Sequence, residues 1–263
     1  MQTPDTDLRI SLAQQDIIWE DKQANLAYIH RTVADLSGKT DIVIFPEMCT
    51  TGFSMNTYAL AETIDDNTIL RLKEWSQKYK VAICGSFIAR DGEQFYNRAF
   101  CITSTNQYFY DKRHLFRMGR EPEAFSSGKK RIVFELNGFN ICLLVCYDLR
   151  FPVWARNVGN EYDLLIYMAN WPTARAKVWD TLLTARALEN MCYVCGVNRI
   201  GEDGNRLKHS GGSKLVDARG ENILSLPLNQ VQVGTVSISK RELQEFRAKF
   251  PVWKDADEFD IKL

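Results

Sequence analysis

The stretch "ICLLVCYDLRFP" covers Ile141–Pro152 of a 263-residue chain. Its first five residues are apolar, and a run of this length and composition is typical of a buried strand. The run ends at Cys146, charged and aromatic residues follow at once, and beyond Pro152 we predict a helix over Val153–Val158. A buried strand does not need a thiol at its last position. Cys146 is therefore either a packed core residue or a nucleophile held at a strand end.

Length and composition exclude several classes of protein. A chain of 263 residues buries most of its apolar surface without disulfide or metal staples. Its 33 basic and 33 acidic residues leave no basic excess for nucleic acid. The longest apolar stretches fall far short of the about 20 residues that a membrane span needs. The polar N-terminus has no signal-peptide order, and the seven cysteines lie in apolar surroundings, so we expect reduced thiols in a cytoplasmic protein.

Strand-like and helical segments alternate along the chain without a low-complexity linker, which predicts a single domain over residues 1–263. Apolar residues at helical spacing predict helices over 22–36 and 177–190, and Asp66 is a candidate N-cap of a third. The Asp-Gly pair in "RDGEQ" predicts a hairpin turn between two strands. Alternation mixed with hairpins indicates mixed sheets covered by helices.

Cys192 and Cys195 form a C-x-x-C pattern, which also occurs in redox pairs and zinc sites. The pair lies inside an apolar strand pattern, where residues three apart point to opposite faces, and no second C-x-x-C occurs. Three histidines, His30, His114 and His209, have no partner at the spacing of metal ligands. We therefore predict buried thiols, no metal, and a packed or hydrogen-bonded His114. Nucleotide-loop and serine-hydrolase motifs are also absent.

Three other chemical groups stand where strand-like runs end: Glu47, Lys112 and Cys146. Alone, each has an ordinary explanation as a solvated carboxylate, a surface lysine or a buried thiol. Together they supply the base, cation and thiol that acyl transfer by a cysteine needs when histidine is missing. We expect Glu47 to take the thiol proton, and Lys112 and the Tyr147 N–H to hold an oxyanion. The lysine and the N-terminus of the following helix are expected to lower the pKa of the thiol.

Three segments, "FPEMCTTGFSMN", "YDKRHLF" and "VCYDLRFPVW", resemble the signature segments of the nitrilase superfamily of carbon–nitrogen hydrolases. The Glu-Lys-Cys triad of that family falls here on Glu47, Lys112 and Cys146, and the match covers nearly the whole chain. The resemblance implies an α/β fold, the four-layer α-β-β-α sandwich, with no metal and no organic cofactor. It also implies a second glutamate after the lysine. Glu121 fits best by its distance from the glycine that ends the loop, and Glu123 remains an alternative.

Within the superfamily, "YDKRHLFRM", "CYDLRFPVWARN", "ANWP", "LLTARALEN" and "FPVWKDADEF" look most like bacterial omega-amidases. Those enzymes hydrolyse the terminal amide of 2-oxoglutaramate and 2-oxosuccinamate, releasing ammonia. An aliphatic amidase, an N-carbamoyl amidohydrolase, a nitrilase and a catalytically silent binding module remain alternatives. The resemblance also implies homodimers or higher homo-oligomers paired through the helical face. We expect the tail, residues 250–263, to pack on a neighbouring subunit.

A substrate with a carboxylate calls for an arginine, because the planar guanidinium matches a carboxylate bidentately. The candidates near predicted strand ends are Arg150, Arg175 and Arg199. Arg150 is equally suited to a structural ion pair with Asp148 or Glu189. Trp171, after "YMAN", is either part of the pocket or a core aromatic.

Overall fold

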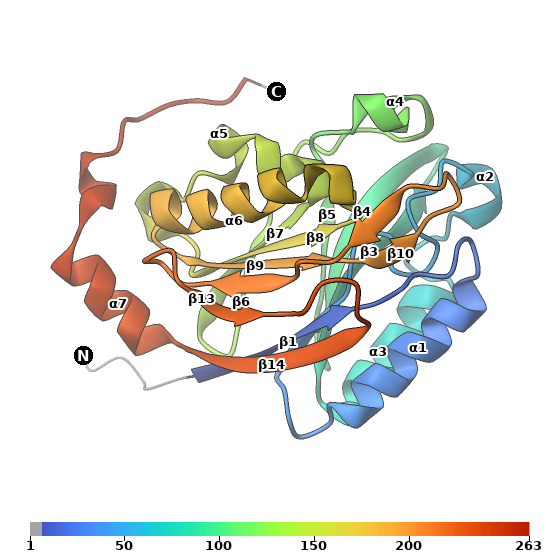
Figure 1. Cartoon of the computed structure of the whole chain (residues 1–263), viewed down its shortest axis with the longest axis horizontal. Helices are drawn as coiled ribbons and strands as arrows, with labels where there is room; N and C mark the ends of the chain where they lie inside the picture. The colour runs from blue at the N-terminus through green and yellow to red at the C-terminus, as the bar shows by residue number, and fades with distance from the viewer. Residues whose placement is uncertain (1–6, 263) are drawn as a thin grey trace.

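The computed structural model describes residues 7–262. It has two six-stranded sheets, and the first contains strands from both the N-terminal and the C-terminal part of the chain. In spatial order the strands are β14 (Gln232–Ser239), β1 (Asp7–Gln14), β2 (Ile42–Ile44), β3 (Ala82–Asp91), β4 (Gln94–Ile102) and β5 (Gln107–Asp111). The first three strands in chain order run parallel, and the others pair antiparallel. Helices α1 (Lys22–Asp35) and α3 (Asn67–Tyr79) cover its outer face (Figure 1).

The second sheet has the same plan, with three parallel strands between antiparallel ones. Its order is β13 (Asn222–Ser225), β12 (Lys214–Val216), β9 (Tyr193–Asn198), β8 (Leu164–Ala169), β7 (Phe139–Val145) and β6 (Val133–Leu136). Helices α5 (Pro152–Ala155) and α6 (Ala176–Asn190) lie on its outer face (Figure 1). The α-β-β-α sandwich predicted from the sequence is therefore confirmed.

The largest core cluster lies between the two sheets. Residues with period-2 spacing on β1 point into it, namely Leu8, Ile10 and Leu12. On β2, Ile42 and Ile44 join the same cluster, whereas Val43 packs outward under α1 and α3. This alternation follows from strand geometry, which sends successive side chains to opposite faces. Both faces of the sheet are covered at β2, so this short parallel strand is apolar throughout.

The predicted helix Val153–Val158 is wrong in its extent. Helix α5 makes a single turn over Pro152–Ala155, and the backbone is extended at Arg156. The side chain of Asn157 then hydrogen-bonds to backbone groups of Tyr162. Because an amide side chain competes with helical hydrogen bonds, it favours the turn over a longer helix.

The helices predicted over 22–36 and 177–190 are confirmed as α1 and α6, and the Asp-Gly hairpin is confirmed between β3 and β4. Gly92 has the positive φ of 59° that the turn requires. Asp66 is the N-cap residue of α3, but its side chain accepts from the Thr63 N–H rather than from the helix. It therefore stabilises the preceding turn.

The remaining elements lie at the rims of the sandwich: α2 (Thr57–Leu60), α4 (Glu121–Ala124), the ribbon of β10 (Ile200–Glu202) and β11 (Lys208–Ser210), and α7 (Lys240–Lys249). Beyond α7 the chain extends along the edge of the molecule toward the side that carries α5 (Figure 1). Residues 1–6, where no signal peptide was expected, and residue 263 lie outside the described residues. Among the residues described, no helix is both long and apolar enough to cross a membrane.

Candidate active site

Three buried ionisable side chains from three elements meet at one edge of the sandwich. Glu47 follows β2, Lys112 follows β5, and Glu121 begins α4. The Lys112 Nζ lies 2.8 Å from Glu47 Oε1, and 3.0 and 2.9 Å from the two carboxylate oxygens of Glu121. None of these side chains is exposed. Glu123, the alternative to Glu121, lies at the surface and pairs with Arg120.

The two carboxylates fix the charge of the lysine. Burial alone would lower the pKa of Lys112, but the negative charges of Glu121 and Glu47 outweigh burial and hold this pKa above its ordinary value. Burial raises the pKa of Glu121, and the Lys112 charge opposes that rise. Lys112 is therefore a fixed cation at neutral pH, suited to holding negative charge and unsuited to giving up a proton.

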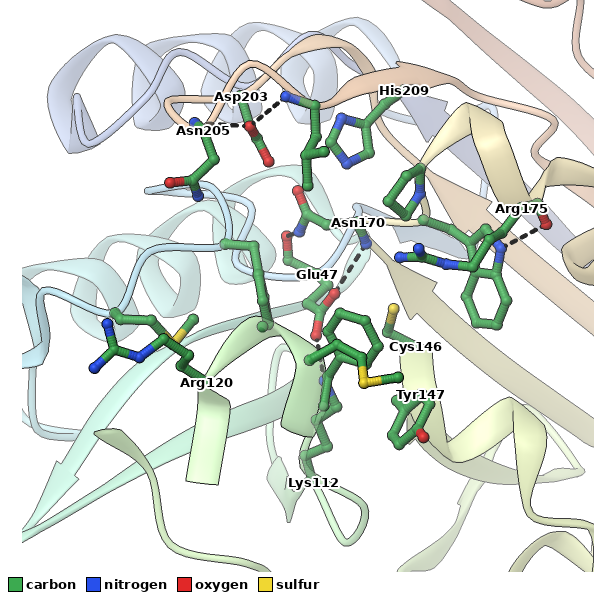
Figure 2. A pocket seen from close by; sticks show the side chains of 18 of the residues that line it. Glu47, Lys112, Arg120, Cys146, Tyr147, Asn170, Arg175, Asp203, Asn205 and His209 are labelled. Atoms are coloured by element: carbon green, nitrogen blue, oxygen red, sulfur yellow. Dashed lines mark hydrogen bonds and ion pairs between the residues drawn. The ribbon is translucent and has the colours of Figure 1, made fainter. Parts of the chain in front are cut away.

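Cys146 stands on the 3₁₀ turn η2 (Cys146–Arg150), directly after β7, with a left-handed φ of 41°. Such a backbone conformation is strained for a residue with a side chain, and strain of this kind accompanies functional sites. Its thiol lines the same cavity as the Glu47 carboxylate. Figure 2 shows the sulfur, Glu47 and Lys112 around one space.

The expectation that the pKa of Cys146 is lowered is wrong. Burial, and after it the charge of Glu47, raise this pKa well above its ordinary value, and Lys112 offsets them only in part. Helix α5 begins six positions later and makes one turn, too short for a substantial helix dipole. The thiol is therefore neutral in the free site, and Glu47, its candidate base, lies near enough for the charge of its carboxylate to act on the thiol.

Two asparagines that the sequence analysis missed hold Glu47 in place. Asn97 Nδ2 donates to Glu47 Oε1 at 2.7 Å and to Glu121 Oε1 at 3.0 Å. The Asn170 backbone N–H donates to Glu47 Oε2 at 2.9 Å, and its Nδ2 donates to the Glu47 carbonyl at 2.6 Å. A polar residue inside or directly after an apolar strand was the available signal for both.

Asp148 connects the loop after Cys146 with the loop after Lys112. Its Oδ1 accepts from the backbone N–H of His114 and bonds to the ring Nδ1 at 2.8 Å, and its Oδ2 accepts from the Tyr110 hydroxyl. His114 is thus hydrogen-bonded and packed, as predicted. Because Asp148 is fully buried and satisfied by these donors, it positions the two loops and does not pair with Arg150.

A cavity of about 740 Å³ opens over this cluster. Two predicted arginines line it: the Arg150 guanidinium lies 5.3 Å from the centre of the Trp171 ring, and that of Arg175 lies 5.3 Å from the centre of Phe116. Within residues 7–262 no carboxylate lies within ion-pair distance of either arginine, and Glu189 pairs with a different one. The cavity thus has two cations available to an anionic ligand.

The other two substrate-binding candidates have different surroundings. Arg199 is fully buried outside the cavity, where its guanidinium bonds to Asp16 and to backbone carbonyls. It is therefore a structural residue. Trp171 lines the cavity and also packs against Trp179 in the core, so it is both a pocket residue and a core aromatic.

The ribbon of β10 and β11 contributes a third side of the cavity, which the sequence analysis missed. His209 and Asn170 both line the cavity (Figure 2). Among the described residues, His209 Nδ1 and Asn170 Oδ1 are buried without a hydrogen-bond partner. Burial and then the charge of Arg199 lower the pKa of His209 to about 4, so its imidazole is neutral. These atoms are available to polar groups of a substrate.

Cys192 and Cys195 are fully buried, and burial raises the pKa of both thiols. Neither lines the cavity. They behave as small hydrophobic residues of the core, as the apolar strand pattern predicted.

Comparison with known proteins identifies the constellation. A family model described as carbon-nitrogen hydrolase matches residues 9–248. The chain belongs to the carbon-nitrogen hydrolase family. Omega-amidase YafV from Escherichia coli (strain K12) is 41% identical over 255 residues, which cover 97% of this chain and 98% of that protein. A 2-oxoglutaramate amidase from Bacillus subtilis (strain 168) is 31% identical over 251 residues, covering 94% and 96%.

Solved structures of other carbon-nitrogen hydrolases share the fold. A CN-hydrolase superfamily protein from Xanthomonas campestris, described with an arsenic adduct in its active site, superimposes with a TM-score of 0.95 at 40% identity, covering 97% of this chain and 99% of that chain. An amidase from Nesterenkonia sp. gives 0.82 at 26% identity, covering 95% and 97%. The nitrilase-superfamily resemblance is confirmed, and the protein is a hydrolase of carbon–nitrogen bonds other than peptide bonds.

Proposed function

We propose that this hydrolase is an omega-amidase that converts 2-oxoglutaramate and 2-oxosuccinamate to the 2-oxo dicarboxylate and ammonia. The observation that carries the proposal is one cavity that joins a cysteine, a base and a cation to two arginines, neither of which pairs with a carboxylate of residues 7–262. Cys146, Glu47 and Lys112 account for the attack on an amide. The arginines account for an amide that carries a carboxylate at its other end.

Acylation begins with the neutral thiol. Glu47 accepts the proton of Cys146 as the sulfur attacks the amide carbonyl carbon, so no free thiolate has to persist in the buried site. Lys112 Nζ and the Tyr147 N–H hold the negative oxygen of the tetrahedral intermediate. Glu47, now protonated, gives that proton to the amide nitrogen, and ammonia leaves. A thioester between Cys146 and the acyl group remains.

Deacylation reverses the proton movements with water in place of the thiol. Glu47 takes a proton from the water as its oxygen attacks the thioester, Lys112 again holds the oxyanion, and the proton returns to the sulfur of Cys146 as it leaves. Glu121 is a positioning residue, because it binds both the ammonium of Lys112 and the backbone N–H of Phe116 without lining the cavity.

The substrate carboxylate is proposed to bind between Arg150 and Arg175. Stacking on Trp171 and Phe116 holds both guanidinium planes at the cavity while leaving their N–H groups free of carboxylates. Arg150 is exposed and Arg175 is half-buried. An amide without a carboxylate would leave both without an ionic partner, so we expect it to be a poorer substrate.

A panel of substrates tests this proposal. Ammonia release is measured with 2-oxoglutaramate, glutamine, a simple aliphatic amide, a nitrile and an N-carbamoyl amino acid, and kcat/KM is compared. We expect 2-oxoglutaramate to lead by at least about a hundred-fold, since losing a charged hydrogen-bonded partner costs a few kcal/mol. Preference for another compound would reject the omega-amidase assignment, and no turnover with any compound would favour a silent binding module.

We further propose that two or more copies pair through the face that carries α5 and α6. Exposed apolar side chains occur on or next to these helices, at Val153, Val158 and Leu188, and on the tail, at Phe250 and Phe259. Apolar surface of this kind on both the helical face and the tail supports an interface in which one tail covers the neighbouring subunit.

A further inference from the structure

Asn97 lies at the centre of the buried cluster and has no role in the mechanism above. It stands in the middle of β4 and is almost fully buried. Its Nδ2 donates one hydrogen to Glu47 and the other to Glu121, and its backbone carbonyl accepts from the Lys112 N–H at 3.0 Å. This one residue therefore bonds to both carboxylates and to the backbone of Lys112, although it does not line the cavity.

The amide of Asn97 is held in one orientation by a closed chain of hydrogen bonds. The Ser86 hydroxyl accepts from the Met48 N–H at 2.7 Å, so its own hydrogen goes to Asn97 Oδ1 at 3.0 Å. With Oδ1 occupied as an acceptor, Nδ2 must face the carboxylates. Met48 follows Glu47 directly, so the chain of bonds returns to the residue that it positions.

These contacts divide the two oxygens of Glu47 between two tasks. Oε1 accepts from Lys112 and from Asn97, which fills both of its lone pairs. Within residues 7–262, Oε2 accepts a hydrogen bond from the Asn170 N–H alone, which leaves a lone pair for the thiol proton. The cluster also carries two carboxylates against one ammonium, so a neutral donor shared by both lowers the cost of burying the extra negative charge.

We propose that Asn97 is a positioning residue for the amidase reaction: its amide binds Oε1 of Glu47 and thereby directs Oε2 toward Cys146 for proton transfer. The part of this inference that concerns amide turnover rests on the proposed function. The charged or titratable groups that face Glu47 are Lys112 from the end of β5, Glu121 from α4 and Cys146 from η2. Without Nδ2 of Asn97, Glu47 and Glu121 each lose a hydrogen-bond donor, and the repulsion between their carboxylates is no longer offset.

The test compares Asn97→Leu and Asn97→Asp with the wild type over a range of pH. Leucine has a similar size but no donor, and aspartate keeps the shape while replacing the donor with an acceptor. We expect kcat to fall about ten- to hundred-fold near neutral pH, and the acidic limb of the pH–rate profile to move up by about one to two pH units. KM should stay unchanged, because Asn97 does not contact the substrate.

Asn157→Leu is the matched control. Asn157 is also buried and uses its side chain in three hydrogen bonds, to backbone groups of Tyr162 and Asn190 on the opposite side of the second sheet. This variant should lose thermal stability and keep the wild-type pH profile. If Asn97→Leu yields no folded protein, the isosteric Asn97→Asp decides the question. If a folded Asn97 variant has the acidic limb of its pH–rate profile at the wild-type pH, the proposal is overturned, whether or not kcat is reduced.

A second readout separates this inference from the substrate assignment. The rate at which iodoacetamide alkylates Cys146 also depends on Glu47 as the base, and it needs no amide substrate. We expect the acidic limb of the alkylation rate to move upward in both Asn97 variants and to stay in place in Asn157→Leu. If the wild type hydrolyses no amide of the panel, the proposed function fails, while unchanged alkylation profiles alone would reject the role of Asn97.

Discussion

At the scale of single residues, the resting state of Cys146 sets this site apart from one that stores a thiolate. A cation beside a cysteine ordinarily favours the thiolate. Here Lys112 is already neutralised by two carboxylates, and burial keeps the sulfur protonated. The proton therefore has to move to Glu47 during attack, and the exact placement of that carboxylate by Asn97 and Asn170 matters more than the basicity of the sulfur.

His209 makes the stability of the protein depend on pH. The pKa of its buried imidazole is about 4 in the folded chain, against an ordinary value of 6.5. As pH falls below 6.5 the unfolded chain binds a proton at this histidine and the folded chain does not. The free energy of unfolding is therefore lost between pH 6.5 and 4, by about 2 to 3 kcal/mol from this residue.

Urea unfolding of the wild type and His209→Gln at about pH 7.5 and about pH 4.5 measures this contribution. We expect the wild type to lose about 2 to 3 kcal/mol more than the variant between the two conditions. His30 and His114 are present in both proteins, so their titration cancels. An equal loss in the two proteins would show that His209 is protonated freely in the folded state.

The triad residues were predictable one by one because each follows a strand-like run and has a side chain that is out of place in ordinary packing. Asn97 and His209 gave weaker signals. The role of an asparagine within a strand comes here from the two carboxylates that it binds, Glu47 and Glu121, which lie 50 and 24 positions away. A lone histidine gains a role only from its place in the cavity wall. Tertiary hydrogen bonds of this range have no local pattern, so sequence periodicity does not reveal them.

At the scale of elements, the strands and long helices followed from periodicity, whereas the segment after Cys146 did not. Its sequence has helical composition, but Asp148 turns back to accept from the Tyr110 hydroxyl and from His114. These contacts hold η2 and α5 as separate short turns. The prediction of a lowered Cys146 pKa failed mainly because burial and the charge of Glu47 outweigh Lys112, and the one-turn helix is too short to reverse this.

The parallel strands explain why residues from distant parts of the chain converge. Strands β7 and β8 are neighbours and parallel, so their carboxyl ends present Cys146 and Asn170 at one edge of the sheet. Glu47 follows β2 of the facing sheet, and Asn170 binds it directly across the sandwich. The site therefore lies where the two sheets meet, and it depends on their correct packing.

At the scale of the whole molecule, the sequence predicted the four layers through the family resemblance, and the assembly stays a prediction.

Deleting residues 250–263 removes the exposed apolar side chains of the tail. If the tail packs on a neighbouring subunit, sedimentation should show the full-length chain as a dimer or larger and the truncated chain shifted toward monomer. A full-length monomer, or an assembly unaffected by truncation, would contradict this arrangement. The control is Asp257→Ala, which removes a charged side chain from the same tail and keeps its apolar side chains. This variant should leave the assembly in place.

The whole account requires that the acyl group of the substrate passes through a thioester on Cys146. Acid-quenching the enzyme during turnover of 2-oxoglutaramate, followed by peptide mass spectrometry, detects this bond directly. We predict a 2-oxoglutaryl group on the Cys146 peptide, absent from Cys146→Ala, a variant that should fold normally and lose at least about 10⁴-fold in kcat. An acyl group on another residue, or near-normal turnover by folded Cys146→Ala, would contradict the account.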